Sequence, residues 1–89
     1  MFLEIVSPEK TLFEGDVTSV HVPGSEGSFQ ILNNHAPIVS TLKKGSIRLK
    51  GNFDTNQDNL DIHSNNEASL NIQSGVIEVK KNKLIILVD

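Results

Sequence analysis

Histidine is the residue type in this chain best suited to binding a metal ion or transferring a proton. The sequence contains three histidines, His21, His35 and His63, and no cysteine. They lie far apart, and no pair shows the spacing typical of metal ligands. We therefore expect no metal centre. His21 is predicted to lie on a strand face, His35 to make a hydrogen bond in a turn, and His63 to lie in a solvated loop.

Nucleophilic catalysis would need a serine activated by a histidine, and Ser28 with His35 is the candidate pair. The G-x-S-x-G turn that exposes a nucleophilic serine is absent. Glu26 could pair with Glu14 or Asp16 for acid–base chemistry, but small domains commonly carry such pairs on their surface. We expect no catalytic residue and no cofactor. A hydrolase, the disfavoured alternative, would lose all activity with alanine at His35, whereas a binding protein would at most assemble less well.

The segment Gly24, Ser25, Glu26 and Gly27 has a glycine spacing that invites comparison with phosphate-binding loops. Such loops continue into a lysine and a serine or threonine at the start of a helix. Neither feature follows here. The two glycines instead indicate a tight connection between strands in which positive φ angles are needed. We therefore expect this chain to bind no nucleotide.

The dominant hydrophobic period along the chain is two, which is typical of strands. No stretch shows a capped helical period. Eight to ten short strands predict an all-β sandwich or flattened barrel. Pro37 is expected at a strand start or sheet edge, and Asn82 is expected to take positive φ in a hairpin turn. The predicted strands cover residues 2–6, 11–14, 17–22, 28–32, 38–39, 46–50, 68–72, 76–79 and 84–88, with Thr18, Val20 and Val22 on one face of their strand.

The length of 89 residues leaves room for one domain and one core, so we expect a single domain over 1–89. Residues 51–67 are rich in asparagine and aspartate. They predict a long, variable and mobile hairpin connection, with a short strand over 60–62.

Composition argues against several classes of function. The net charge is −3 and Arg48 is the only arginine, so a nucleic-acid partner is not expected. No apolar run approaches the ~20 residues of a membrane span, and the first residues lack the features of a signal peptide. The chain is expected to stay in the compartment where it is made. A peptide- or carbohydrate-binding β-sandwich remains the alternative, although the absence of Trp and Tyr speaks against an aromatic groove.

Several short segments together carry a family resemblance. They are residues 6–9, 12–15, 20–27, 31–32 and 34–38, the single positions Leu42, Gly45, Ile47 and Arg48, residues 74–79 and the closing strand through Asp89. In this order and spacing they resemble the N-terminal domain of the epsilon subunit of F-type ATP synthases, called delta in mitochondria. The agreement covers nearly the whole chain outside residues 50–66.

The resemblance implies a ten-stranded β-sandwich in the central rotor stalk of the enzyme complex. One side of this domain would bind the gamma subunit, and its end loops would rest on the ring of c subunits at the membrane. The chain would be non-catalytic and would support the coupling of proton translocation to ATP synthesis. It would lie on the cytoplasmic face of the inner (plasma) membrane and contact the membrane only through the complex.

The resemblance also implies which residues face the c-ring. Many family members have an acidic residue where this chain has Ser28, so Glu26 is left to pair with a basic c-ring loop. The gamma-binding face is expected as an apolar patch on the sheet faces, away from the loop of residues 24–27. The residues expected at the c-ring are Gly24, Ser25, Glu26, Gly27, Ser28, Asn33, Asn34, His35, Ala36 and Pro37.

Family members usually continue after the last strand into a two-helix domain, which in bacteria inhibits ATP hydrolysis and can bind ATP. The sequence ends at Asp89, directly after the predicted last strand. We therefore expect a sandwich without a C-terminal helical hairpin, and no inhibition by inserted helices.

Overall fold

The computed structural model describes residues 1–53 and 57–89, and these residues form nine strands. The all-β prediction is confirmed. The strands are β1 (Phe2–Val6), β2 (Thr11–Val22), β3 (Phe29–Leu32), β4 (Ile38–Leu42), β5 (Gly45–Gly51), β6 (Asp61–Ser64), β7 (Glu67–Ile72), β8 (Gly75–Lys80) and β9 (Lys83–Val88).

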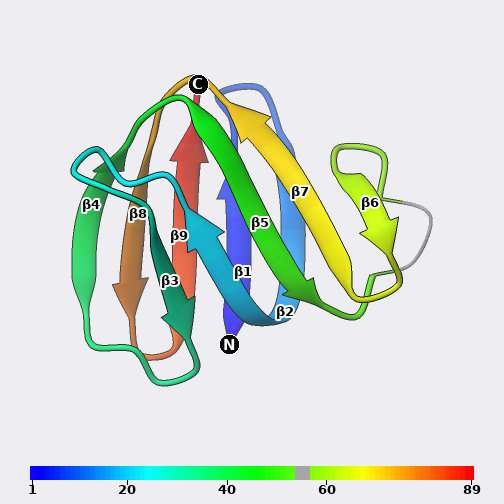
Figure 1. Cartoon of the computed structure of the whole chain (residues 1–89), viewed down its shortest axis with the longest axis horizontal. Coiled ribbons are helices and arrows are strands. Elements are labelled where there is room, and N and C mark those ends of the chain that lie inside the picture. Colours follow the sequence, from blue (N-terminus) through cyan, green and yellow to red (C-terminus); the bar gives the residue numbers. More distant parts are fainter. Residues whose placement is uncertain (54–56) are drawn as a thin grey trace.

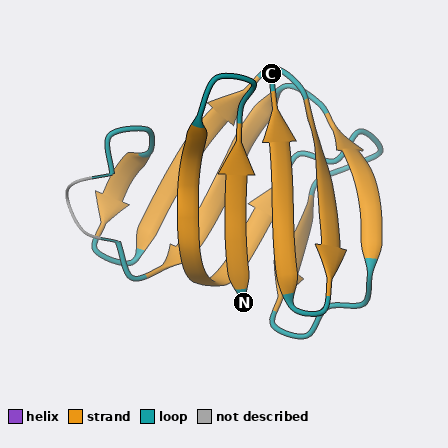
Figure 2. Ribbon diagram, turned by 180° about the vertical axis from the view of Figure 1, so that it is seen from behind, coloured by secondary structure: helices purple, strands orange, loops and turns teal. Residues whose placement is uncertain are grey.

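The strands follow one hydrogen-bonded path, β4-β8-β9-β1-β2-β5-β7-β6, with β3 paired to β2. The long strand β2 belongs to both layers of the resulting sandwich (Figure 1). Its first half pairs with β1 in a layer that we call the β9 sheet (β4, β8, β9, β1). Its second half pairs with β3 and β5 in the β5 sheet (β3, β5, β7, β6). Figure 2 shows the β9 sheet in front. The path ends at β4 and β6, so the fold is an open sandwich and not a closed barrel.

The core lies between the two sheets and is built from alternate residues of each strand. The period of two places every second side chain on the inner face. Burying one aliphatic side chain of this size contributes about 1.5–3 kcal/mol. The largest fully buried side chains are Leu3, Ile5, Val20, Val22, Ile31, Ile47, Leu49, Ile77, Val79, Leu84 and Ile86.

Strand β2 differs from its prediction in two ways. It continues through Gly15, where the sequence predicted an end. Its register also shifts between Val17 and Ser19 where it pairs with β5. The extra residue of this bulge reverses the alternation, so Val17 and Val20 are both buried while Thr18 is exposed. The prediction that Thr18 shares a face with Val20 was therefore wrong.

Two local predictions are confirmed. Lys81 and Asn82 have φ angles of 52° and 60° and join β8 to β9. Positive φ at both central residues is the requirement of a two-residue type I′ hairpin turn. Pro37 directly precedes β4, which is the terminal strand of the sheet path. A residue without an N–H group is tolerated at such an edge.

The connection over residues 51–67 contains β6, which pairs with the outer edge of β7. This strand begins one residue later than predicted and includes His63, which was expected in a loop. Phe53 and Leu60 anchor the connection because both are buried in the core. The ring of Phe53 lies 5.9 Å from that of Phe13. The predicted mobility of this connection concerns in part residues 54–56, which lie outside the described residues.

Over the described ranges 1–53 and 57–89, no helix has the length and apolar character needed to cross a membrane.

Candidate protein-binding surfaces

The 24–28 loop is bound along the edge strand β4. The Ser25 amide donates to the Thr41 carbonyl (3.0 Å), and the Lys43 amide donates to the Pro23 carbonyl (2.9 Å). The Thr41 hydroxyl also donates to the Ser25 hydroxyl (2.8 Å). These bonds cover part of the β4 edge, which would otherwise present unpaired backbone groups.

The two glycines of this loop serve different purposes. Gly27 has φ = 134°, which confirms the prediction of positive φ at this position. Gly24 has no positive φ. It is needed for space, because a Cβ atom there would lie 2.6 Å from the Gly27 carbonyl oxygen and 2.7 Å from the Phe29 ring. The backbone of the loop therefore fits closely against itself, while Ser25, Glu26, Gly27 and Ser28 remain exposed.

The 33–37 turn is bound to the β8–β9 turn through Asn82. The Asn34 amide donates to Asn82 Oδ1 (2.9 Å), and Asn82 Nδ2 donates to Asn33 Oδ1 (2.8 Å). His35 Nδ1 lies 2.7 Å from the carbonyl oxygen of Ala36, which confirms its predicted hydrogen bond in the turn. Asn82 thereby links two turns that are far apart in the sequence.

The structure does not bring the 24–28 loop and the 33–37 turn to one end of the molecule. They lie at opposite ends of β3, with the loop beside Thr41 and the turn beside Asn82 (Figure 1). Four residues of extended strand at about 3.3 Å each separate them. A catalytic serine and histidine must be within hydrogen-bond reach of each other. Ser28 and His35 therefore do not form such a pair.

An apolar surface covers part of the outer face of the β9 sheet. We define it by Val6, Val39, Val76, Ile85 and Leu87. Leu87 lies directly opposite Val76 on β8 and Val6 on β1. Val39 is 70% exposed, Leu87 52% and Val76 37%. An apolar patch on a sheet face was expected, but its predicted separation from the glycine loop was wrong. Val39 and residues 24–27 line the same hollow, because the loop runs along the β4 edge.

Three glutamates share this outer face. Glu4 lies opposite Glu14 on β2 and opposite Ile85 on β9. Glu78 lies opposite Ile85 and Val39. The face therefore carries acidic side chains next to the apolar surface. We call Glu4, Glu14 and Glu78 the acidic row; it was not predicted from the sequence. The alternation in the sequence could have predicted it, since each of these glutamates follows a buried apolar residue of its strand and therefore points to the outer face.

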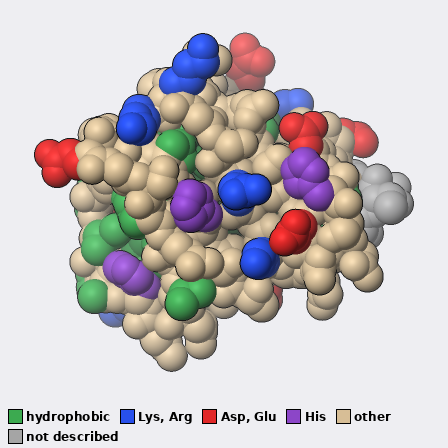
Figure 3. Space-filling view, viewed as in Figure 1, with side chains coloured by type: hydrophobic (Ala, Val, Ile, Leu, Met, Phe, Trp, Pro, Cys, Tyr) green, Lys and Arg blue, Asp and Glu red, His purple; other side chains and the backbone are tan. Residues whose placement is uncertain are grey.

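The outer face of the β5 sheet is largely polar, and histidine, cationic and acidic side chains gather on it (Figure 3). His63 Nε2 lies 2.8 Å from the Ser69 hydroxyl. His21 lies on a strand face as predicted, and its Nδ1 is buried without a hydrogen-bond partner among the described residues. A buried nitrogen without a partner costs about 1–3 kcal/mol. Lys50 and Glu67 form an exposed ion pair with an N–O distance of 4.0 Å.

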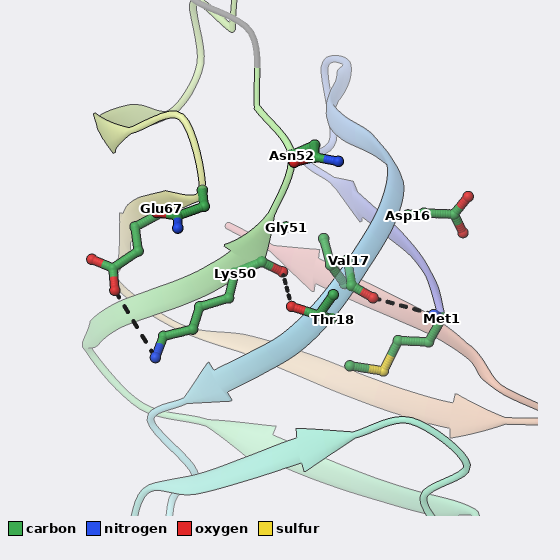
Figure 4. A pocket seen from close by; sticks show the side chains of 9 residues that line it. Met1, Asp16, Val17, Thr18, Lys50, Gly51, Asn52 and Glu67 are labelled. Carbon is green, nitrogen blue, oxygen red and sulfur yellow. Dashed lines mark hydrogen bonds and ion pairs between the residues drawn. The ribbon is translucent and has the colours of Figure 1, made fainter.

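A hollow of about 760 Å³ lies beside the β2 bulge (Figure 4). The Thr18 hydroxyl donates to the Lys50 carbonyl (3.0 Å), and the Met1 nitrogen donates to the Val17 carbonyl (3.2 Å). Lys50 and Glu67 approach each other on one side of the hollow, while Asp16 lies on the other. No histidine lines it, and its charges have both signs, so the hollow offers no assembled chemistry.

Across the part of the chain that the structure describes, no three His, Cys, Asp or Glu side chains are grouped so that they could hold a metal ion.

The chain is thus a two-layer β-sandwich whose loops are held by hydrogen bonds and whose β9 sheet exposes apolar side chains. Residues 1–89 match the family model for the beta-sandwich domain of the ATP synthase delta/epsilon chain. The chain belongs to this family. It is therefore an epsilon-type, non-catalytic subunit of an ATP synthase, which confirms the family resemblance seen in the sequence.

Two curated relatives show how much of such chains this sequence spans. It is 40% identical over 87 residues to the ATP synthase epsilon chain of Chlorobium limicola, covering 98% of this chain and 86% of that protein. It is 39% identical over 87 residues to the epsilon chain of Leptospira borgpetersenii serovar Hardjo-bovis, but covers only 59% of that protein.

Solved structures support the fold. One match is a chain in the structure of the Tetrahymena thermophila mitochondrial ATP synthase central stalk and c-ring. The match covers 98% of this chain and 61% of that chain, with a TM-score of 0.78 and 17% sequence identity. A chain of the Euglena gracilis mitochondrial ATP synthase matches 97% with a TM-score of 0.75 and 15% identity, over 48% of its length.

Proposed function

We propose that this chain is a rotor-stalk subunit that links the gamma subunit of an F-type ATP synthase to its ring of c subunits. In this role it supports the coupling of proton translocation to ATP synthesis from the cytoplasmic face of the membrane. Family membership supports the proposal, as does the likeness to a chain solved in a central stalk and c-ring structure. A stiff sandwich suits this role because a close-packed core resists shear between its layers.

The observation that carries the proposal is the apolar surface on the β9 sheet. Val76 and Leu87 are cross-strand neighbours and are both exposed, and Val39 extends the surface to the edge strand. Exposed apolar patches rimmed by polar residues mark sites of protein interaction. We assign this face to the gamma subunit. The adjacent Glu4, Glu14 and Glu78 would favour basic side chains on the partner.

The c-ring contacts are assigned to the 24–28 loop and the 33–37 turn. Glu26 is exposed and has no ion-pair partner within the described ranges, so it is free to pair with a basic c-ring loop. His35 is the candidate contact from the turn. Because the two segments lie at opposite ends of β3, both can reach the ring only if β3 lies along its surface.

The test is co-purification with the gamma subunit from the same genome, using two matched variants. Leu87→Asp places a charge in the apolar surface. Leu32→Asp places the same charge on the other sheet, at a leucine that is 53% exposed, compared with 52% for Leu87. We expect Leu87→Asp to lose the gamma subunit and Leu32→Asp to retain it. If both folded variants bind equally well, or fail equally, the assignment of this face is wrong.

A further inference from the structure

A second hollow, of about 430 Å³, lies on the outer face of the β5 sheet, on the opposite side of the sandwich from the apolar surface. Arg48 lies on β5, the middle one of the strands that line it. On β2, His21 lies directly opposite Arg48, and on β7, Ser69 lies directly opposite it on the other side. Directly opposite residues are about 5 Å apart. A group resting on the Arg48 guanidinium would therefore lie within reach of side chains from both neighbouring strands.

The hollow is rich in hydrogen-bond donors that lack acceptors. Arg48 has no carboxylate within 4 Å among the described residues, since the ion pair found there joins Lys50 to Glu67. His63 Nε2 and the Ser69 hydroxyl share one hydrogen bond. Whichever of them donates, one further N–H or O–H of this pair remains free.

His21 adds a donor from the other side. Its Nδ1 is buried without a partner among the described residues, whereas its Nε2 is not among the buried unpaired atoms. A buried lone pair without a donor is tolerated better than a buried N–H without an acceptor. This favours the tautomer with its proton on Nε2, where it is available to a ligand. Gln30 and Ser19 line the same hollow.

The residues that line the hollow include two cations, Arg48 and Lys50, and one carboxylate, Glu67, on a chain that is negative overall. Lys50 is neutralised by Glu67, and Asp61 lies at the rim, opposite Ser69 on β6. Arg48 remains as the second cation, with two imidazoles beside it. A planar guanidinium binds phosphate through two parallel hydrogen bonds, and a tetrahedral oxyanion can accept from several further donors at once.

We propose that this hollow binds a phosphate group, either as the free ion or as the phosphate ester of a larger molecule. The inference goes beyond the stalk role, because it concerns the sheet that the apolar surface does not include. A gamma subunit on the β9 sheet would leave the site uncovered, whereas the proposed c-ring contact runs along β3, whose Gln30 lines the hollow.

The test is a nuclear magnetic resonance titration of the whole chain with inorganic phosphate, at ionic strength held constant with sodium chloride. We expect saturable shifts at the ring protons of His21 and His63 and at the Arg48 side chain. Arg48→Gln should weaken binding about tenfold or more, because it removes charge-assisted hydrogen bonds. Arg48→Lys keeps the charge but not the planar guanidinium that makes two parallel hydrogen bonds, so it should give an intermediate loss of affinity. Glycerol phosphate binding more tightly than the free ion would indicate an ester as the physiological ligand.

Lys80→Gln is the matched control, because Lys80 is an exposed cation on β8 in the other sheet. It should leave the affinity unchanged. The amide spectrum of each variant reports whether it is folded, and His63→Gln provides a second probe if Arg48→Gln fails to fold. Three results would each overturn the proposal. The shifts could follow ionic strength alone, the Arg48→Gln variant could bind phosphate with unchanged affinity, or acetate could bind as tightly as phosphate.

Discussion

Glu4 and Glu14 face each other across β1 and β2 on the outer face of the β9 sheet. Like charges directly opposite each other in a sheet destabilise it, by an amount within the ~0.2–1 kcal/mol range of such pairs. An isolated domain gains nothing from this arrangement. A basic partner surface would turn it into favourable pairing, so the pair is an expected feature of an interface.

Glu14→Lys replaces this repulsion with attraction. We expect it to raise the free energy of unfolding of the isolated chain by about 0.5 kcal/mol, measured by urea denaturation, because the pair becomes complementary. The same change should weaken co-purification with the gamma subunit. Glu9→Lys is the matched control, because it makes the same change of charge in an exposed turn outside the acidic row. It should change neither the free energy of unfolding nor the co-purification with gamma. If the Glu14→Lys variant binds the gamma subunit as tightly as the unmodified chain does, the acidic row is not part of the interface.

Single residues also show where sequence reasoning succeeds. The positive φ of Gly27 and Asn82 followed from residue type, because glycine and asparagine tolerate the left-handed region. The requirement for Gly24 did not follow in this way. It depends on the position of the Phe29 ring, which lies several residues further along the chain.

At the level of elements, the β8–β9 turn has two roles. It joins two strands, and its Asn82 holds the 33–37 turn through Asn33 and Asn34. The proposed c-ring contact His35 lies in that turn. The position of His35 therefore depends on a side chain that is distant in the sequence.

Asn82→Ala should lower the free energy of unfolding by about 1.5 kcal/mol, because alanine is disfavoured at positive φ and two hydrogen bonds are lost. Lys81→Ala is the matched control. It keeps a non-glycine residue at positive φ and removes only an exposed side chain, so a change within about 0.5 kcal/mol is expected. Chemical denaturation measures both. Equal effects of the two substitutions would show that the side chain of Asn82 does not hold the 33–37 turn.

Strand β2 shows why elements were predicted less well than their turns. Its alternation is correct on each side of Thr18, but the bulge that exchanges the two faces leaves no mark in the local sequence. It arises where one strand must leave the β9 sheet and join the β5 sheet. The same limit applies to Phe53 and Leu60, since their burial depends on where the connection lies against Phe13 and the rest of the core.

For the whole molecule, the two faces of the sandwich differ in character. The β9 sheet presents the apolar surface with Glu4, Glu14 and Glu78 beside it, and Lys80 and Lys83 at the ends of β8 and β9. The β5 sheet presents His21, His63 and Arg48 together with the Lys50–Glu67 ion pair. Composition and period could predict a sandwich but not this division, because it requires knowing which strands share a layer. The predicted c-ring residues are a different case. Their separation could have been read from the sequence, because the strand predicted over residues 28–32 lies between the two segments and was found as β3.

The proposed function requires the gamma subunit to cover the apolar surface on the β9 sheet. Because the chain contains no cysteine, Val39→Cys introduces a single thiol into that surface. The most direct measurement is the rate at which a maleimide labels this thiol, followed by mass spectrometry, in the free chain and in the complex with gamma. We expect rapid labelling of the free chain and strong protection in the complex, with Leu32→Cys labelled at the same rate in both. Unchanged labelling of Val39→Cys in the complex would contradict the account.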